Sequence, residues 1–229
     1  MSHVTSTPAK APPLKAAIIP VTPLQQNCTL FWCTETNKGA LVDPGGDLDK
    51  LKAAVAQTGV QLEKLLITHG HLDHTFSVIP LADGYGIPAY IHSEDRKALL
   101  NPELLLGKEF TSSLSAMSWS EPSQVLELRN NQKFEAVGLD ITAIHAPGHT
   151  AGSLMFTVND EVLISGDVLF AGSIGRTDQP TGSQEAMVRT LTTKIVPLGD
   201  HLRVLPGHGP DTTIEYERRT NPYLKQLRS

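Results

Sequence analysis

Three histidines and one aspartate lie within seven residues, in the run Thr68-His69-Gly70-His71-Leu72-Asp73-His74. Imidazole nitrogens and carboxylate oxygens are ligands that zinc, iron and manganese take in proteins. A lone histidine is usually a hydrogen-bonded core or surface residue, but four such side chains at this spacing are a far more specific signal. The run directly follows the apolar residues Leu65-Leu66-Ile67, which end a predicted strand. We therefore expect a metal centre at the end of that strand.

Three later apolar stretches also end in a glycine-containing turn that presents a histidine or an aspartate. The turns are Pro147-Gly148-His149-Thr150, Ser165-Gly166-Asp167 and Pro206-Gly207-His208-Gly209. Strand ends and the loops after them are where α/β folds place chemistry, because the sheet is rigid and the loop is exposed. Together with the first run, these turns provide seven candidate metal ligands: His69, His71, Asp73, His74, His149, Asp167 and His208.

Seven ligands are too many for one ordinary zinc ion and suit two ions. We expect His69, His71 and His149 to hold the first ion, and Asp73, His74 and His208 to hold the second, with Asp167 bridging them. A hydroxide between ions ~3.5 Å apart would be a strong nucleophile near pH 7, because each metal lowers the pKa of bound water. This arrangement predicts hydrolysis without a serine or cysteine nucleophile. A single structural zinc is disfavoured, because structural sites are usually closed four-ligand sets rich in cysteine.

Bulk properties narrow the classes of protein. The chain has 229 residues, a hydrophobic fraction of 40% and a formal net charge of −5. This length can bury a sizeable core, and the acidic balance argues against nucleic-acid binding through a basic face. No apolar run approaches the ~20 residues that span a bilayer, so we expect no membrane partner. Cys28 and Cys33 lie five residues apart on a predicted strand and point to opposite faces, which excludes a disulfide and fits a reducing, cytoplasmic compartment.

The order of predicted elements, strands then helix, repeats roughly in the two halves of the chain. This predicts two β-rich halves packed face to face with helices outside. Residues 1–15 read as a flexible tail, and residues 16–229 as a single domain. We expect a helix from Asp47, as its N-cap, to Thr58, and another from Asp73-His74 to about Asp83. Residues 101–123 read as an irregular excursion, either a substrate wall or a simple surface insertion.

Asp43 opens the turn Asp43-Pro44-Gly45-Gly46 at the end of a predicted strand. Two interpretations stay open. It could be a turn former that bonds to nearby backbone, or a carboxylate that hydrogen-bonds beneath a metal ligand. Thr68 and His145, which belong to the motifs that carry the ligands, are candidates for the same supporting role.

The Thr-His-x-His-x-Asp-His run, followed by His149, Asp167 and His208, resembles the ligand series of the metallo-β-lactamase superfamily in order and approximate spacing. The resemblance extends from about Ala16 to Gly209. It implies an α/β (α+β) fold, the αββα sandwich, with two mixed β-sheets, helices on the outer faces and a dinuclear site at one edge. The metals it implies are two divalent ions, zinc first, with iron or manganese as alternatives.

Within the superfamily, the chain looks most like the glyoxalase II group, the hydroxyacylglutathione hydrolases. The motifs that carry this resemblance are Val42-Asp43-Pro44-Gly45, Thr68-His69-Gly70-His71, His145-Ala146-Pro147-Gly148-His149-Thr150, Ser165-Gly166-Asp167 and Gly207-His208-Gly209-Pro210. The implied reaction is hydrolysis of S-lactoylglutathione to lactate and glutathione. Asp73 and Asp167 are the implied catalytic carboxylates.

One departure from that group concerns substrate recognition. Full-length glyoxalase II proteins carry a helical C-terminal domain that supplies basic contacts to glutathione, whereas only Pro210 to Ser229 follow the last candidate ligand here. The chain therefore resembles the short branch of the group. Arg176 is our candidate for contacting glutathione, and the alternative is a loop arginine in a salt bridge.

A second branch of the same fold, the persulfide dioxygenases, also resembles this chain. Its single iron is held by residues that correspond to His69, His149 and Asp167. We favour thioester hydrolysis because Gly207-His208-Gly209-Pro210 resembles the hydrolase branch. A lactamase, a nuclease and a non-enzymatic metal-binding scaffold are weaker alternatives. We expect a monomer or weak homo-oligomer.

Overall fold

The first sheet is formed by strands that lie between Leu14 and Leu128. The computed structural model describes residues 13–106 and 118–227. The strands run in the order β1 (Leu14–Val21), β2 (Gln26–Cys33), β3 (Lys38–Val42), β4 (Gln61–Leu66), β5 (Ala89–His92) and β6 (Val125–Leu128). The β1–β2 and β2–β3 pairs are antiparallel, and the pairs from β3 to β6 are parallel.

The second sheet is formed by later residues and is also mixed. Its order is β14 (Thr212–Thr213), β13 (Arg203–Pro206), β10 (Val162–Gly166), β9 (Leu154–Val158), β8 (Leu139–His145) and β7 (Gln132–Ala136). Only the β10–β13 pair is parallel among these pairs. A separate hairpin follows β10 and consists of β11 (Leu169–Phe170) and β12 (Ser173–Ile174).

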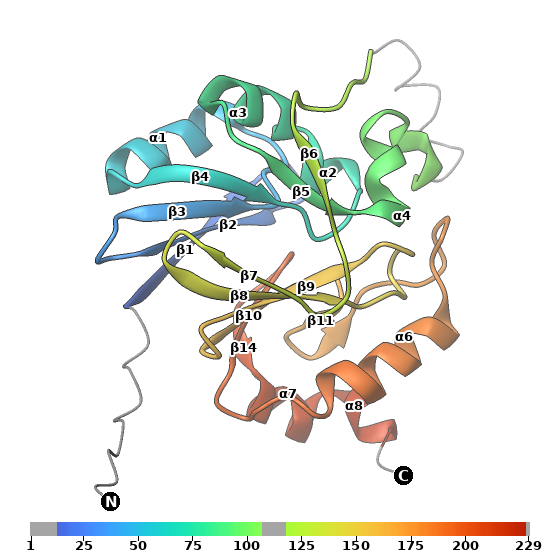
Figure 1. Cartoon of the computed structure of the whole chain (residues 1–229). Helices are drawn as coiled ribbons and strands as arrows, with labels where there is room; N and C mark the ends of the chain where they lie inside the picture. Colours follow the sequence, from blue (N-terminus) through green and yellow to red (C-terminus); the bar gives the residue numbers. More distant parts are fainter. Residues whose placement is uncertain (1–12, 107–117, 228–229) are drawn as a thin grey trace, which may run out of the picture.

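Helices cover the outer faces of the two sheets (Figure 1). On the first sheet these are α1 (Leu48–Thr58) and α3 (Val78–Tyr85), and on the second α6 (Gln184–Thr190), α7 (Ile214–Thr220) and α8 (Pro222–Gln226). Shorter helical pieces are α2 (Leu72–Thr75), α4 (Ser93–Arg96), the 3₁₀ turns Lys97–Leu99 and Pro102–Leu104, and a π-helical turn at Leu191–Ile195 that extends α6. The predicted αββα sandwich of two mixed sheets is confirmed.

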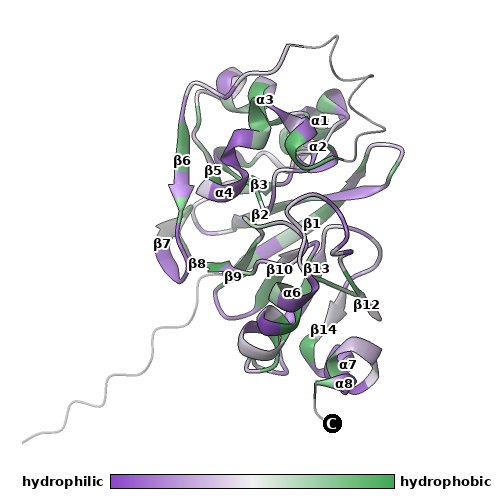
Figure 2. Ribbon diagram, turned by 90° about the vertical axis from the view of Figure 1, so that its right-hand side faces the viewer, coloured by the Kyte–Doolittle hydropathy of each residue, from purple (hydrophilic) through white to green (hydrophobic). Residues whose placement is uncertain are grey.

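Three apolar clusters hold the four layers together. The central cluster joins the sheets and includes Phe31 and Leu66 from the first and Phe156 from the second. The outer clusters join each sheet to its helices. In Figure 2, β10 in the interior is green and hydrophobic, whereas the surface helix α4 is purple. Burial of these apolar side chains is the main favourable term that holds the layers in place.

Side chains of strand β2 point alternately to the two faces of the sheet and therefore pack in two different apolar clusters. Cys28 and Leu30 face the helices of the first layer, whereas Phe31 and Cys33 face the second sheet. Both cysteines are buried and free, so the prediction that they do not pair is confirmed.

Two predicted boundaries are wrong. The helix expected from Asp73 to Asp83 is divided at Phe76 and Ser77, where Ser77 N donates to the carbonyl of Pro44 at 2.9 Å and so leaves the helical pattern. Leu14 and Lys15, which we assigned to the tail, belong to β1, because Leu14 pairs with Cys33 and packs on the central cluster. The rest of the predicted tail, residues 1–12, lies outside the described residues.

Asp47 precedes α1 but does not cap it with its side chain. It has a left-handed φ of 47°, and its carboxylate accepts a hydrogen bond from Thr22 N at 3.1 Å.

Residues 107–117 of the predicted excursion lie outside the described residues. None of the described residues forms a helix long and apolar enough to cross a bilayer.

Replacing Phe156 with alanine tests the central cluster. The ring is fully buried between the sheets, so Phe156→Ala should lower the free energy of unfolding by about 3–5 kcal/mol. Leu126→Ala, in the exposed part of β6, should change it by less than about 1 kcal/mol. Chemical denaturation of both variants measures the difference, and equal losses would contradict the assigned packing.

Candidate metal centre

All seven predicted ligands gather at one edge of the sandwich. The first four follow β4, while His149, Asp167 and His208 follow β8, β10 and β13 of the other sheet. Strands β10 and β13 are parallel neighbours, with Gly166 beside Pro206, so Asp167 and His208 emerge side by side. Gly207 lies against Asp167, and a Cβ there would sit 2.2 Å from the carboxylate, which explains the glycine.

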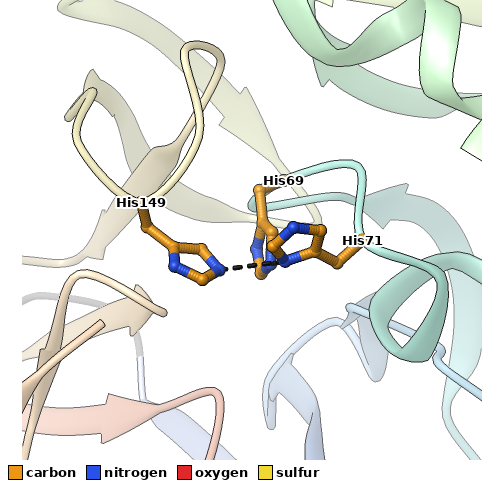
Figure 3. A group of neighbouring side chains, drawn as sticks. All are labelled: His69, His71 and His149. Carbon is orange, nitrogen blue, oxygen red and sulfur yellow. Dashed lines mark hydrogen bonds between the residues drawn. The ribbon is translucent and has the colours of Figure 1, made fainter. Parts of the chain in front are cut away.

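Three buried histidines direct ring nitrogens at one another across the junction of the sheets (Figure 3). Nε2 of His69 lies 3.0 Å from Nδ1 of His71, and Nε2 of His149 lies 2.9 Å from the same atom. Two of these rings belong to the loop after β4, and the third belongs to the turn after β8.

Backbone carbonyls determine which nitrogen carries the proton on two of these rings. Nδ1 of His149 lies 2.8 Å from the carbonyl oxygen of Arg176, and Nε2 of His71 lies 3.2 Å from that of Leu105. A carbonyl can only accept, so these ring nitrogens are the donors. In the neutral rings, the nitrogens that face each other at 2.9 Å therefore both carry lone pairs.

Thr68 determines which nitrogen carries the proton on the third ring, that of His69. Its hydroxyl donates to Oδ2 of Asp43 at 2.6 Å, so it accepts from Nδ1 of His69 at 3.0 Å. Nε2 of His69 then also carries a lone pair. Three converging lone pairs repel one another unless a cation lies among them, and hydrogen bonds to the outer nitrogens are typical of histidines that bind metals. This donor set fits a divalent metal.

The ionisation of these rings agrees with that assignment. Burial and the neighbouring rings, His74 foremost among them, hold the pKa of His69 well below its usual range. Burial and the ring of His149 lower the pKa of His71 to about 3. Both rings are therefore neutral near pH 7, the form in which imidazole binds a metal.

Asp73, His74 and His208 form a second group beside the first. Nε2 of His208 lies 3.3 Å from Oδ2 of Asp73 and 3.4 Å from Nε2 of His74. The outer nitrogens are again occupied: Nδ1 of His74 donates to Asp43 at 2.9 Å, and Nδ1 of His208 donates to the carbonyl of Leu24 at 3.3 Å. Both Nε2 atoms consequently face the carboxylates.

Opposite charges dominate this second group. Burial by itself would lower the pKa of His74, but the carboxylates of Asp167, Asp43 and Asp73 raise it to about 10. Burial would raise the pKa of Asp73, but the rings of His74 and His208 hold it well below its usual range. Three carboxylates around one ring require a nearby positive charge. Either a divalent cation or a proton on the ring can supply that charge.

Asp167 lies between the two groups. Its Oδ1 is 3.5 Å from Nε2 of His74, and its Oδ2 is 3.6 Å from Nε2 of His149 and 3.8 Å from Nε2 of His208. Oδ1 is buried and accepts no hydrogen bond from the described residues. A buried carboxylate oxygen without a donor is costly unless it binds a cation, so this position suits a ligand shared by two ions.

Asp43 lies beneath His74 and is 2% exposed. Its oxygens are within 4.8 Å of ligand atoms of His69 and His74, so distance alone would admit it as a ligand. They already accept three hydrogen bonds, from Thr68 N at 2.7 Å, from the Thr68 hydroxyl and from His74. These hydrogen bonds favour the supporting carboxylate over the turn former, because the donors lie 25 and 31 residues away.

His145 does not support a ligand directly. Its Nε2 donates to the carbonyl of Ala151 at 2.8 Å, and its ring stacks on that of His92 at 3.9 Å. Among the described residues, no hydrogen bond joins it to the seven candidate ligands, so its predicted role is wrong. It braces the backbone of the loop that carries His149.

Arg176 was predicted either to contact glutathione or to be a loop arginine in a salt bridge, and the structure shows a salt bridge. Its guanidinium makes a bidentate pair with Asp178, with both distances 2.8 Å. The pair is exposed, although Arg176 also lines the cavity described below. The backbone of Arg176 matters more to the centre, because its carbonyl sets the proton position on His149.

Asp95 is a supporting residue that the sequence did not reveal. This fully buried carboxylate accepts from Gly70 N at 2.9 Å, Gly152 N at 2.8 Å and the Thr150 hydroxyl at 2.6 Å. It thereby joins the loop of His69 and His71 to the loop of His149. No spacing in the sequence linked Asp95 to loops 25 and 55 residues away.

Asn27 is a second supporting residue without a sequence signal. Its Nδ2 donates to the carbonyls of Pro206 and Gly209, at 3.0 and 2.8 Å, and its N donates to that of Gly207. Strand β2 of the first sheet therefore holds both sides of His208, which is presented from the second sheet.

A cavity of about 940 Å³ opens over both groups. His71, Asp73, His149, Asp167 and His208 form its floor. Its apolar walls contain Leu24, Leu72, Phe76, Leu106, Phe170 and Ile174. The arrangement provides an open, largely apolar cavity in which a small molecule can lie against the candidate metal ligands.

The four-layer sandwich and the His/Asp groups at its edge define a metallo-hydrolase. The chain belongs to the metallo-beta-lactamase superfamily, whose family model matches residues 21–209.

Three similar proteins cover nearly the whole chain. The hydroxyacylglutathione hydrolase GloC of Haemophilus influenzae is 37% identical over 213 residues, which are 90% of this chain and 96% of that protein. The crystal structure of BLEG-1 B3 metallo-beta-lactamase has a TM-score of 0.82 and 32% identity, covering 92% of this chain and 99% of that one. TTHA1623 in a di-iron-bound form has a TM-score of 0.75 and 33% identity, covering 91% and 100%.

Replacing Asp95 with alanine tests the link between the loops. Two buried backbone N–H groups and one hydroxyl lose their acceptor, so Asp95→Ala should lower the free energy of unfolding by about 3 kcal/mol or more. The exposed neighbour provides the control, because Glu94→Ala should change stability by no more than about 0.5 kcal/mol. Equal stability of the two variants in denaturant would contradict this role.

Proposed function

We propose that this protein is a two-metal thioester hydrolase that converts hydroxyacylglutathione thioesters, such as S-lactoylglutathione, to the hydroxy acid and glutathione. The observation that carries the proposal is the full-length similarity to the GloC hydrolase, at 37% identity over 90% of this chain. The second group of candidate ligands favours a hydrolase with two ions over the single-iron dioxygenase branch, because it is complete and lies beside the first.

We assign His69, His71 and His149 to one ion. The second ion takes Asp73, His74 and His208, and Asp167 is shared. The unprotonated ring nitrogens and the unsatisfied Oδ1 of Asp167 support this assignment. Zinc is our first choice, and iron or manganese suits the same donors. The di-iron form of TTHA1623 makes iron a concrete alternative.

The bound ions would polarise the thioester carbonyl and supply hydroxide near neutral pH. The residues of the chain bind and orient the reacting groups. Asp73 lines the cavity, and its low pKa keeps it ionised, so its carboxylate is suited to accept a hydrogen bond from the attacking water and orient it. Leu24, Phe76 and Phe170 would provide apolar contacts to a substrate at the walls of the cavity. The new C–O bond replaces the C–S bond, and the departing thiolate takes up a proton.

A second candidate is β-lactam hydrolysis, which the likeness to BLEG-1 B3 metallo-beta-lactamase favours. The same hydroxide chemistry opens an amide ring, so the ligand groups do not separate the two reactions. Substrate contacts would separate them. The cytoplasmic location, the monomeric or weakly oligomeric state and the role of Arg176 in glutathione binding stay part of this proposal.

Metal removal and substrate comparison test the function directly. Metal-loaded protein should hydrolyse S-lactoylglutathione, measured by loss of thioester absorbance. Chelation should reduce the rate by about 100-fold or more, because the nucleophile is lost, and added metal should restore it. Cleavage of a chromogenic cephalosporin without thioester turnover would establish the lactamase instead. Oxygen uptake with glutathione persulfide and no thioester turnover would establish the dioxygenase.

Asp167→Ala tests the shared ligand. It should reduce the metal content from about two ions per chain to below about one, and activity should fall with it, because both ions lose a carboxylate oxygen. Asp160→Ala, at an exposed hairpin turn after β9, should keep both metals and the activity. Elemental analysis of the dialysed variants gives the answer, and two retained metals in Asp167→Ala would refute bridging.

A further inference from the structure

The β11–β12 hairpin forms one wall of the cavity. Phe170, Ser173 and Ile174 line it, and the Phe170 ring lies 6.3 Å from that of His208. The hairpin begins just after Asp167 and leads into Arg176, whose carbonyl accepts from His149. Its position thus affects both the shape of the cavity and the surroundings of the candidate ligands.

A buried carboxylate from the C-terminal helix α7 holds the turn of this hairpin. Glu217 is 0% exposed, and its Oε2 accepts from Gly172 N at 2.8 Å. Its Oε1 accepts from the Thr212 hydroxyl at 2.7 Å, which joins the same carboxylate to β14. Burying a charge is costly unless it is fully hydrogen-bonded, so this carboxylate stabilises one arrangement of its partners.

Asn221 completes the contact from the break between α7 and α8. Its Nδ2 donates to the carbonyl of Ser173 at 3.0 Å and to Oε2 of Glu217 at 2.8 Å. Its Oδ1 accepts from Tyr223 N at 3.0 Å and caps α8. The Asn221 amide thus joins the hairpin to Glu217 of α7 through its Nδ2 and to the start of α8 through its Oδ1.

We propose that Glu217 and Asn221 are positioning residues that set this wall of the cavity and thereby substrate affinity. Neither residue lines the cavity, so they act through the backbone of residues 172 and 173. The effect on affinity rests on the proposed thioesterase function, whereas the effect on the hairpin does not.

Three variants separate positioning from simple stability. Glu217→Ala removes the acceptor for Gly172 N. Glu217→Gln is the conservative rescue, because its carbonyl can accept from Gly172 and Asn221, while its amide can donate to the Thr212 hydroxyl. Glu215→Ala, at an exposed position of the same helix, is the control.

Hydrogen exchange and steady-state kinetics on the metal-loaded full chain provide the readouts. In Glu217→Ala, amide exchange across residues 169–174 should become about tenfold faster or more, because a charge-assisted bond is lost. KM for S-lactoylglutathione should rise roughly tenfold while kcat stays within about twofold. Metal content should not change. Glu217→Gln and Glu215→Ala should behave like the wild type in all three measurements.

Two results would overturn the inference. One is unchanged hairpin exchange in Glu217→Ala. The other is unchanged KM with a loss confined to the amount of folded, active protein, which is what a merely structural residue would give. If the wild type hydrolyses no thioester, the proposed function fails, and hydrogen exchange alone then decides whether Glu217 positions the wall.

Discussion

Mutual repulsion among ring nitrogens is the constraint on which the rest of this edge depends. The nitrogens of His69, His71 and His149 approach to 2.9 and 3.0 Å while their protons point outward. Such an arrangement persists only if the surrounding structure enforces it or a cation compensates it. The loops, carbonyls and buried carboxylates around the centre all serve that enforcement.

Three buried carboxylates share this task, and each accepts a backbone N–H from a loop at the edge. Asp43 holds the residue before His69, Asp95 ties the loops of His71 and His149 together, and Glu217 holds the hairpin that follows Asp167. A carboxylate suits this role because it accepts several bonds, each of which is stronger than a bond between neutral groups. The two groups of candidate metal ligands are thus positioned by hydrogen bonds between distant segments as well as by strand ends.

The sequence predicted the features that depend on local pattern. Ligand spacing after strand ends was visible, because a strand delivers its last residues to a sheet edge wherever the sheet lies. The helix beginning at Asp73 was predicted too long, because its break depends on Ser77 reaching the carbonyl of Pro44. Asp95 and Glu217 were not found, since their partners are set by packing and not by spacing. His145 was misassigned because a motif places a residue near a ligand without showing which way its ring points.

Substrate recognition is the part that sequence addresses least. Arg176 is the first candidate for contacting glutathione, and its guanidinium is paired with Asp178. The cavity walls instead combine apolar side chains from loops of both sheets, and such combinations have no signature in a linear pattern. The centre and the wall therefore have separate determinants, ligand spacing for one and C-terminal packing for the other.

The central claim is a two-ion centre bridged by Asp167, and anomalous X-ray diffraction from metal-loaded crystals tests it most directly. We expect two anomalous peaks, one among His69, His71 and His149 and one among Asp73, His74 and His208, with Asp167 between them. A single peak at the first group, with His208 and Asp73 free of metal at saturating concentration, would contradict it.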